Sequence, residues 1–282
     1  MRIILSRKGF DSGVKAGGVA SPILDGKLIS LPIPGGPGKI RYNDLHIGRH
    51  SLGKIVEDLT RRRLKRTDSV HYDPDLRHAA RKRATGWRPI FGQGGAAETH
   101  LRNYGVTVGD LFLFFGWFRE VELHDGSYRY KPDSPNRHIL YGWLQVGAIL
   151  TFPERHFAKI PWAEYHPHFY GAFGTVYLAS DHLRTRGRSY DAPAAGVFHR
   201  YNDSLRLTAP DSKNRGIWQL PKWFYPRNNE SPLSYHPNLK AFEKHRNHTI
   251  LHTAARGQEF ILDTAEYPEA IRWARRLITN AT

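Results

Sequence analysis

The chain has 282 residues, and 42 Lys and Arg outnumber 26 Asp and Glu, for a formal net charge of +16. This excess favours a polyanionic partner, most often a phosphate backbone. The chain contains no cysteine, which excludes disulfides, thiolate catalysis and cysteine-ligated metal sites. We find no apolar run long enough for a signal peptide or a membrane span. We therefore expect a cytoplasmic protein that binds nucleic acid or nucleotide and no membrane.

The N-terminal segment predicts a strand that leads into a glycine-rich loop. The strand begins in MRIILSR and breaks at Lys8-Gly9. Backbone N–H groups of such a loop can cradle phosphate, with Arg or Lys supplying charge. Asp11 is the candidate catalytic carboxylate of the loop, or it satisfies its own backbone in a plain surface turn. The candidate phosphate-binding residues here are Arg7, Lys8, Ser12, Gly17 and Gly18.

Further along, residues 27–32 predict a second strand after an Asp25-Gly26 turn. Residues 51–64 predict a helix with Ser51 as its cap, because apolar residues recur at helical spacing. A basic stretch then covers residues 61–83. It lies next to a group of carboxylates, which makes it a candidate phosphate-binding region.

The stretch His71-Tyr72-Asp73-Pro74-Asp75 holds a histidine and two carboxylates within five residues. His71, Asp73 and Asp75 could act as acid–base groups or hold a divalent metal. In an extended segment all three would point to one side. The alternative is a helix entry, with Asp73 as cap and Pro74 at the first helical position. We assign the three residues as candidate catalytic groups and assign no metal site.

Two apolar segments, residues 111–123 and 137–150, predict long strands joined across a polar hairpin. A short helix is expected at 98–104, a hairpin around Asn202-Asp203, and a final amphipathic helix from Pro268. Because strands follow strands without βαβ alternation, the fold class is α+β. We expect one domain over residues 1–282, with a curved mixed or antiparallel sheet and a few peripheral helices.

Aromatic and basic residues together predict base and phosphate contacts. Aromatic faces stack bases while cations hold phosphates, although most such aromatics belong to a core. A glycine-flanked glutamine can read a base edge. The candidates are Arg88, Gln93, Trp117, Arg137 and Trp143.

Several blocks together resemble the nucleotide modification associated domain 3 family. They are SRKGFDS, HYDPDL, WRPIFGQGGA, HLRNYGVTVGDLFLFFGWFR and RHILYGWLQVG, with weaker likeness in TVYLAS and RGQEFILD. The resemblance implies a bacterial or phage protein of a DNA-base modification system, without implying a reaction. A looser likeness of residues 100–150 to PUA-like barrels such as the EVE and ASCH groups implies a barrel-like subregion. Fold likeness alone does not establish function.

Three functional hypotheses follow. The first is a protein that binds nucleic acid or nucleotide and takes part in DNA base modification. The second is an enzyme, a transferase or hydrolase, that uses Asp11 and the carboxylates of residues 71–75. The third is a non-catalytic reader or scaffold of modified bases. A concave pocket that joins Asp11, residues 71–75 and Gln93 would favour the enzyme, and separated loops would favour the reader. The sequence assigns no cofactor and no oligomeric state.

Overall fold

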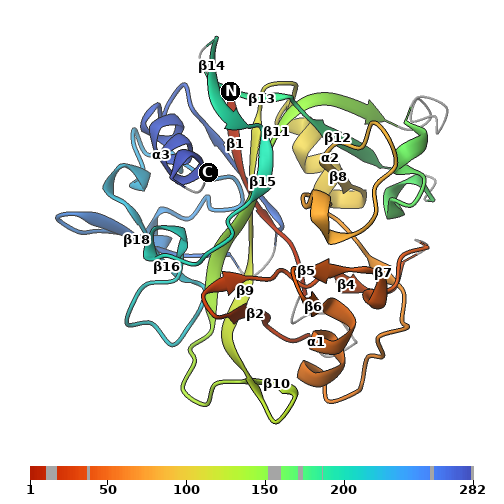
Figure 1. The fold of residues 1–282 in the computed structure, drawn as a ribbon. Helices are drawn as coiled ribbons and strands as arrows, with labels where there is room; N and C mark the ends of the chain where they lie inside the picture. The colour runs from red at the N-terminus through yellow and green to blue at the C-terminus, as the bar shows by residue number, and fades with distance from the viewer. Residues whose placement is uncertain are drawn as a thin grey trace.

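The computed structural model describes residues 1–10, 18–36, 39–151, 160–170, 174–185, 187–254 and 257–280. The fold is α+β, as predicted, with three α-helices and a large mixed sheet among these residues (Figure 1). None of the described helices is both long enough and apolar enough to cross a bilayer.

The large sheet has β9 and β11 at its centre. Its main path runs in the order β19 (Glu259–Asp263), β1 (Arg2–Arg7), β9 (Leu111–His124), β11 (Arg137–Thr151), β12 (Thr175–Ala179) and β8 (Ile90–Gln93). Strands β2 (Ser21–Leu24), β3 (Lys27–Leu28), β10 (Ser127–Tyr130) and β15 (Ala195–Val197) branch from this path. β1 and β2 both run parallel to β9, and the remaining pairs are antiparallel.

The long central strands form because their apolar runs are covered on both faces. Residues 111–116 of β9 and 138–146 of β11 are all buried. A strand that is buried on both faces has a continuous apolar sequence rather than an alternating one. The two long strands predicted from the sequence are therefore confirmed, and they pair with each other across the hairpin.

Smaller elements surround the large sheet (Figure 1). The three helices are α1 (Leu52–Leu59), α2 (Gly95–Asn103) and α3 (Glu269–Thr279). The small sheets pair β4 (Ile33–Pro34) with β7 (Val70–His71), β5 (His46–Ile47) with β6 (His50–Ser51), and β13 (His182–Thr185) with β14 (Arg188–Pro193). A third strand group runs β16 (Ile217–Pro221), β18 (His248–His252) and β17 (Phe242–Lys244). Seven short 3₁₀ helices lie between these elements, and η4 (Pro167–Phe169) matters for the site.

The helices were predicted with different accuracy. α3 follows Pro268 and buries the apolar face expected for it, and α2 begins slightly earlier than predicted. α1 ends at Leu59 rather than at residue 64. The Thr60 hydroxyl donates to the Val56 carbonyl at 2.7 Å, and Arg61 and Arg62 both have positive φ. The chain thus leaves the helix before the basic stretch. The apolar periodicity had assigned residues 61–64 of that stretch to the helix.

Two local predictions were wrong, and one alternative that the sequence left open is excluded. The strand at 27–32 is only Lys27–Leu28, and the hairpin around Asn202 is instead β15 followed by a 3₁₀ turn at Asp203–Leu205. The helix entry at Asp73-Pro74 is absent, and that peptide bond is cis. The backbone of Asp75 pairs in both directions with Ile90 of β8, at 2.9 and 3.0 Å. These two bonds hold the segment extended along the sheet edge.

The barrel-like subregion expected at residues 100–150 does not form a closed barrel. Among the described strands, β19 and β8 end the main path and do not pair with each other. Residues 111–151 instead form the central hairpin of the open sheet. The likeness to PUA-like barrels is therefore limited to the sequence pattern and does not extend to a closed barrel.

Candidate functional site

A pocket of about 220 Å³ opens where β1 leaves the large sheet. Four segments that are far apart in the sequence meet there: the end of β1, the end of β7, the end of β8 and the turn η4. Strand β9 contributes the floor beside them through Gly116 and Trp117. The lining side chains that carry chemistry are Arg7, Lys8, His71, Asp73, Gln93, Trp117, His168 and Arg215.

Asp73 is the buried carboxylate of the pocket. Its Oδ1 accepts the Gly92 N–H at 2.7 Å and contacts His166 Nε2 at 3.1 Å, and His168 Nε2 lies 3.6 Å from Oδ2. Burial alone would raise the pKa of this carboxyl group. The hydrogen bond of His166 and the nearby His168 ring outweigh burial and hold the pKa of Asp73 below its usual value. Asp73 is therefore ionised at neutral pH.

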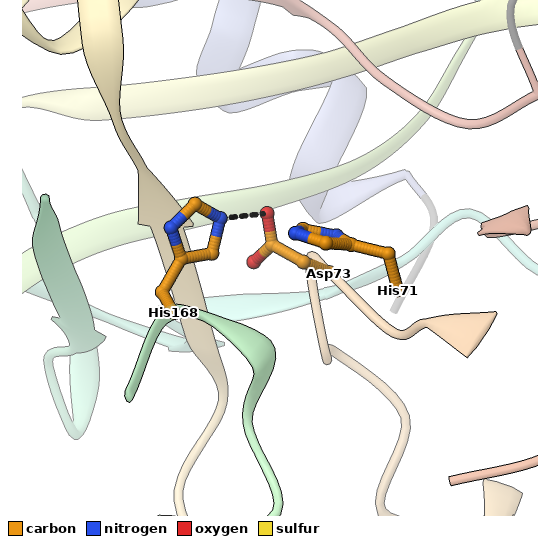
Figure 2. A group of neighbouring side chains, drawn as sticks. All are labelled: His71, Asp73 and His168. Atoms are coloured by element: carbon orange, nitrogen blue, oxygen red, sulfur yellow. Dashed lines mark ion pairs between the residues drawn. The ribbon is translucent and has the colours of Figure 1, made fainter. Parts of the chain in front are cut away.

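His71 lies beside this carboxylate, two residues before it in the chain. Its ring meets the His168 ring edge-on, with centroids 5.0 Å apart. Burial lowers the pKa of His71 to about 4, although Asp73 acts in the opposite direction. The imidazole is therefore neutral at pH 7. Figure 2 shows the two rings on either side of the carboxylate.

Gly92 of β8 makes room for His168. A Cβ atom at this position would lie 2.3 Å from Cδ2 and 2.4 Å from Cγ of the His168 ring. The absence of a side chain lets the ring pack directly against the strand, while the N–H of the same residue binds Asp73. One glycine thus sets the distance between the histidine and the carboxylate.

A buried ion pair closes another side of the pocket. Lys8 Nζ lies 2.9 Å from Glu259 Oε1, and Gln93 Nε2 donates to the same oxygen at 2.6 Å. The Lys8 and Glu259 side chains are 8% and 0% exposed. Gln93 Oε1 accepts the Gly94 N–H at 3.1 Å. Both ends of the Gln93 amide are therefore engaged, and Gln93 holds Glu259 in place.

An aromatic–cation pair forms the opposite wall. The Arg215 guanidinium lies 4.6 Å from the centroid of the Trp117 ring, and the Trp117 indole N–H donates to Asn136 Oδ1 at 2.7 Å. Three cationic side chains, Arg7, Lys8 and Arg215, line the pocket against one carboxylate, Asp73. The lining therefore carries an excess of positive charge, which suits an anionic ligand.

Three side chains of the pocket could hold a metal ion. His71, Asp73 and His168 each offer one ligand atom, and these atoms lie within 4.8 Å of one another. Two imidazoles and a carboxylate suit a divalent first-row transition metal. The same groups could also transfer protons, because a neutral imidazole and a carboxylate accept them. His166 is not a member of the set, since it contacts Asp73 Oδ1 from the other side.

The structure thus brings together six of the residues predicted from the sequence. Arg7, Lys8, His71, Asp73, Gln93 and Trp117 line one pocket. Asp75 lies outside it, and its carboxylate forms a double ion pair with Arg83. The expectation that His71, Asp73 and Asp75 face the same side is therefore wrong for Asp75. A shared pocket is the feature that favours an enzyme over a reader. Of the residues that such a pocket would join, His71, Asp73 and Gln93 line one pocket. Asp11, Ser12 and Gly17 lie outside the described residues.

The other predicted binding residues lie apart from the pocket. Arg88 pairs with Asp181 at 3.0 Å, and Arg137 pairs with Glu120 at 3.2 Å. Trp143 is 2% exposed, and its N–H donates to the Pro193 carbonyl at 3.0 Å. Gly18 is described but does not line the pocket. The binding roles predicted for these four residues stay predictions. None of the four belongs to the pocket described above.

Four residues of the site escaped the sequence reasoning: His166, His168, Arg215 and Glu259. The available signal was the stretch HPHF at 166–169, in which two histidines flank a proline. No sequence pattern connects these two histidines with Asp73. Glu259 is the first residue of β19 and offered no signal of its own.

The family model described as nucleotide modification associated domain 3 matches residues 2–263. The match includes every described residue of the pocket, from Arg7 to Glu259. No curated protein and no solved structure matches the chain. The match covers most of the chain, as the sequence blocks had indicated. The chain belongs to the nucleotide modification associated domain 3 family, whose description implies a part in nucleotide modification.

Proposed function

We propose that the chain is an enzyme that modifies a nucleotide unit, free or within a nucleic acid, in the pocket between β1, β7, β8 and η4. One observation carries the proposal: a single pocket joins cationic side chains to the buried cluster of His71, Asp73 and His168. Perturbed titratable groups in a concave site are typical of active sites. A reader of bases would need the cations and the aromatic ring, but not the cluster.

The cationic wall would hold the phosphate. Arg7 and Arg215 line the pocket with Lys8, whose charge is largely compensated by Glu259 at 2.9 Å. Arginine is well suited to phosphate because its planar group offers paired N–H donors. We therefore propose that Arg7 and Arg215 bind the phosphate. Lys8 stabilises the pocket wall through its ion pair with Glu259.

The base would stack against the Arg215–Trp117 pair. Bases stack on aromatic rings and on guanidinium planes alike, and the two groups already lie in one stack. The pocket volume of about 220 Å³ lies below the range of about 300 to 1,000 Å³ that is common for drug-sized ligands. It suits a base or part of one nucleotide. A base within a duplex would have to leave the helical stack to enter.

The test is a binding and conversion assay on nucleotides, single-stranded DNA and duplex DNA. Binding is measured across a salt series, and products are sought by mass spectrometry after digestion to nucleosides. We expect binding that weakens with salt, single-stranded DNA preferred over duplex, and a mass change in one nucleoside.

The matched variants are Arg215→Ala in the pocket and Arg272→Ala on the exposed face of α3. Each removes one positive charge. Arg215→Ala should weaken binding by about tenfold, in line with about 1 to 3 kcal/mol for a stacked base. Arg272→Ala should change it by less than about twofold. Equal effects of the two variants, or no binding at low salt, would sink the proposal.

A further inference from the structure

We infer that His71, Asp73 and His168 bind one divalent transition-metal ion, which faces the nucleotide pocket (Figure 2). The inference deepens the proposed function and rests on it for the use of the ion, but not for its binding.

The donor atoms have the right kind and nearly the right separation. They lie within 4.8 Å of one another, and His168 Nε2 is 3.6 Å from Asp73 Oδ2. Ligands at about 2.1 Å from one ion lie about 3.0 to 3.4 Å apart at octahedral or tetrahedral angles. A separation of 3.6 Å is too long for a hydrogen bond between the two groups. Bringing the widest separation of 4.8 Å to ligand distances requires the two atoms to approach by about 1.4 to 1.8 Å.

The two oxygens of Asp73 have different surroundings. Oδ1 accepts the Gly92 N–H at 2.7 Å and contacts His166 Nε2 at 3.1 Å. Oδ2 faces His168. In metal centres, a ligating carboxylate is commonly oriented by hydrogen bonds to the oxygen that does not bind the ion. Gly92 and His166 therefore act as positioning residues that aim Oδ2 at the ion.

His71 completes the set from the opposite side. Its ring is half-buried, and no described residue forms a hydrogen bond with either of its nitrogens. A partly buried imidazole without such a bond forgoes a stabilising contact with the protein. Its ring meets the edge of the His168 ring, with centroids 5.0 Å apart. A metal ion between the two rings and Oδ2 would give the His71 nitrogen the partner that it lacks.

The ligand set selects the class of metal. Imidazole ligands favour Fe, Co, Ni, Cu and Zn, and sites for Mg or Ca are built from oxygen ligands. Two histidines and one carboxylate leave coordination positions for water and substrate, which is the arrangement of catalytic rather than structural centres. The remaining positions would face the pocket wall that carries Arg7 and Trp117. The ion would thus supply Lewis-acid or redox chemistry next to the bound nucleotide.

The experiment is a metal titration of the whole chain after treatment with a chelator. Zn²⁺ and Co²⁺ are titrated by calorimetry, and bound Co²⁺ is also followed by its visible spectrum, with Mg²⁺ as the comparison. We expect one Zn²⁺ or Co²⁺ per chain, and Mg²⁺ bound at least about a hundredfold more weakly. The variants His71→Ala and His168→Ala should each weaken Co²⁺ binding by tenfold or more, about the loss typical even of outer-shell changes.

The matched control is His248→Ala in β18, where His248 stacks on His245 away from the pocket. It should leave the Co²⁺ affinity unchanged. His166→Gln tests the positioning role and should alter the Co²⁺ spectrum while one ion per chain is still bound. Thermal unfolding of each variant shows that the fold is retained.

Two results would overturn the inference: no stoichiometric Co²⁺ or Zn²⁺, or binding that survives His71→Ala and His168→Ala in folded protein. The outcomes separate it from the proposed function. If the ion binds but no nucleotide is bound or converted, the metal site stands and the proposed function falls. If the metal-free protein converts nucleotides equally well, the use of the ion in the reaction falls and the proposed function stands.

Discussion

Asp73 and Asp75 are two residues apart, yet they lie in regions of opposite character. Asp73 faces the pocket, where Oδ1 accepts the Gly92 N–H and contacts His166, whereas within the described part of the chain Oδ2 has His168 Nε2 beside it at 3.6 Å. Asp75 is 0% exposed and sits in a closed network. Pro74 separates them, and strand β8 contacts both, through Gly92 and Ile90.

The network of Asp75 is saturated. Arg83 donates to both of its oxygens, at 2.6 and 2.7 Å, the Trp87 indole N–H lies 3.3 Å from Oδ2, and the Tyr165 hydroxyl donates to Oδ2. Arg83 also lies 4.2 Å from the centroid of the Trp87 ring. Both oxygens of this carboxylate are therefore bound by protein, Oδ2 by three donors and Oδ1 by one. A saturated buried carboxylate stabilises the fold, whereas an incompletely satisfied one next to a pocket is available for chemistry.

The largest effect on stability should come from Asp75→Ala. The substitution leaves the Arg83 guanidinium, 3% exposed, buried without its counter-ion. We expect a loss of about 3 to 5 kcal/mol in the free energy of unfolding, measured by urea denaturation. The double variant Asp75→Ala, Arg83→Met should recover most of this loss, because no buried charge remains. A loss below about 1 kcal/mol for the single variant would contradict the assigned role.

Gly92→Ala should have the next largest effect. The new Cβ would lie 2.3 Å from the His168 ring, so the ring has to move. Overpacking of this kind costs about 1 to 3 kcal/mol, and Co²⁺ affinity should fall as well. Gly216→Ala is the matched control, since its nearest contacts are side-chain oxygens at 3.1 and 3.3 Å. Unchanged metal affinity in folded Gly92→Ala would argue against the geometry of the site.

Asp73→Asn should separate the stability of the fold from the chemistry of the pocket. The amide keeps the shape of the side chain, and the Gly92 N–H can still be accepted. We expect a loss of about 1 to 2 kcal/mol in unfolding free energy, with metal binding and nucleotide conversion abolished. Asp75→Asn should do the reverse, losing stability and keeping Co²⁺ binding. For both variants, calorimetry measures metal binding and urea denaturation measures the free energy of unfolding.

The smallest effect is expected for Trp87→Phe. This change removes the indole N–H that lies 2.9 Å from the Tyr165 hydroxyl and 3.3 Å from Asp75 Oδ2. Arg83 keeps both of its bonds to Asp75. The loss should be about 0.5 to 1.5 kcal/mol, with Co²⁺ and nucleotide affinity within experimental error of the parent. A clear loss of nucleotide affinity would connect the Asp75 network to the pocket.

The fold class could be predicted because its main determinants are local in sequence. The apolar runs at 111–116 and 138–146 are buried on both faces, and such runs identify central strands. Short elements are decided by tertiary contacts instead. The segment from Asp73 to Arg83 has the signature of a helix entry, yet Asp75 pairs through its backbone with Ile90 of β8, and only the short 3₁₀ helix at His78–Ala80 follows. No local pattern contains that information.

The site was half predicted for the same reason. Residues next to each other in sequence, such as Arg7 and Lys8, or His71 and Asp73, could be identified from their chemistry. Their partners His168, Arg215 and Glu259 come from distant segments, and only the sheet order brings them near. The rule that alternate residues of an extended segment share a face failed for Asp75, whose carboxylate binds Arg83 away from the pocket.

The ion pair between Lys8 and Glu259 joins residues 251 positions apart. During synthesis on the ribosome, β1 emerges early but must wait for β9 and then for β19 before both of its edges are covered. Contacts of such long sequence separation form slowly. A nascent chain shorter than 259 residues lacks the carboxylate that Lys8 and Gln93 bind. The pocket is therefore among the last parts of the molecule to assemble, and an unfinished chain lacks one of its walls.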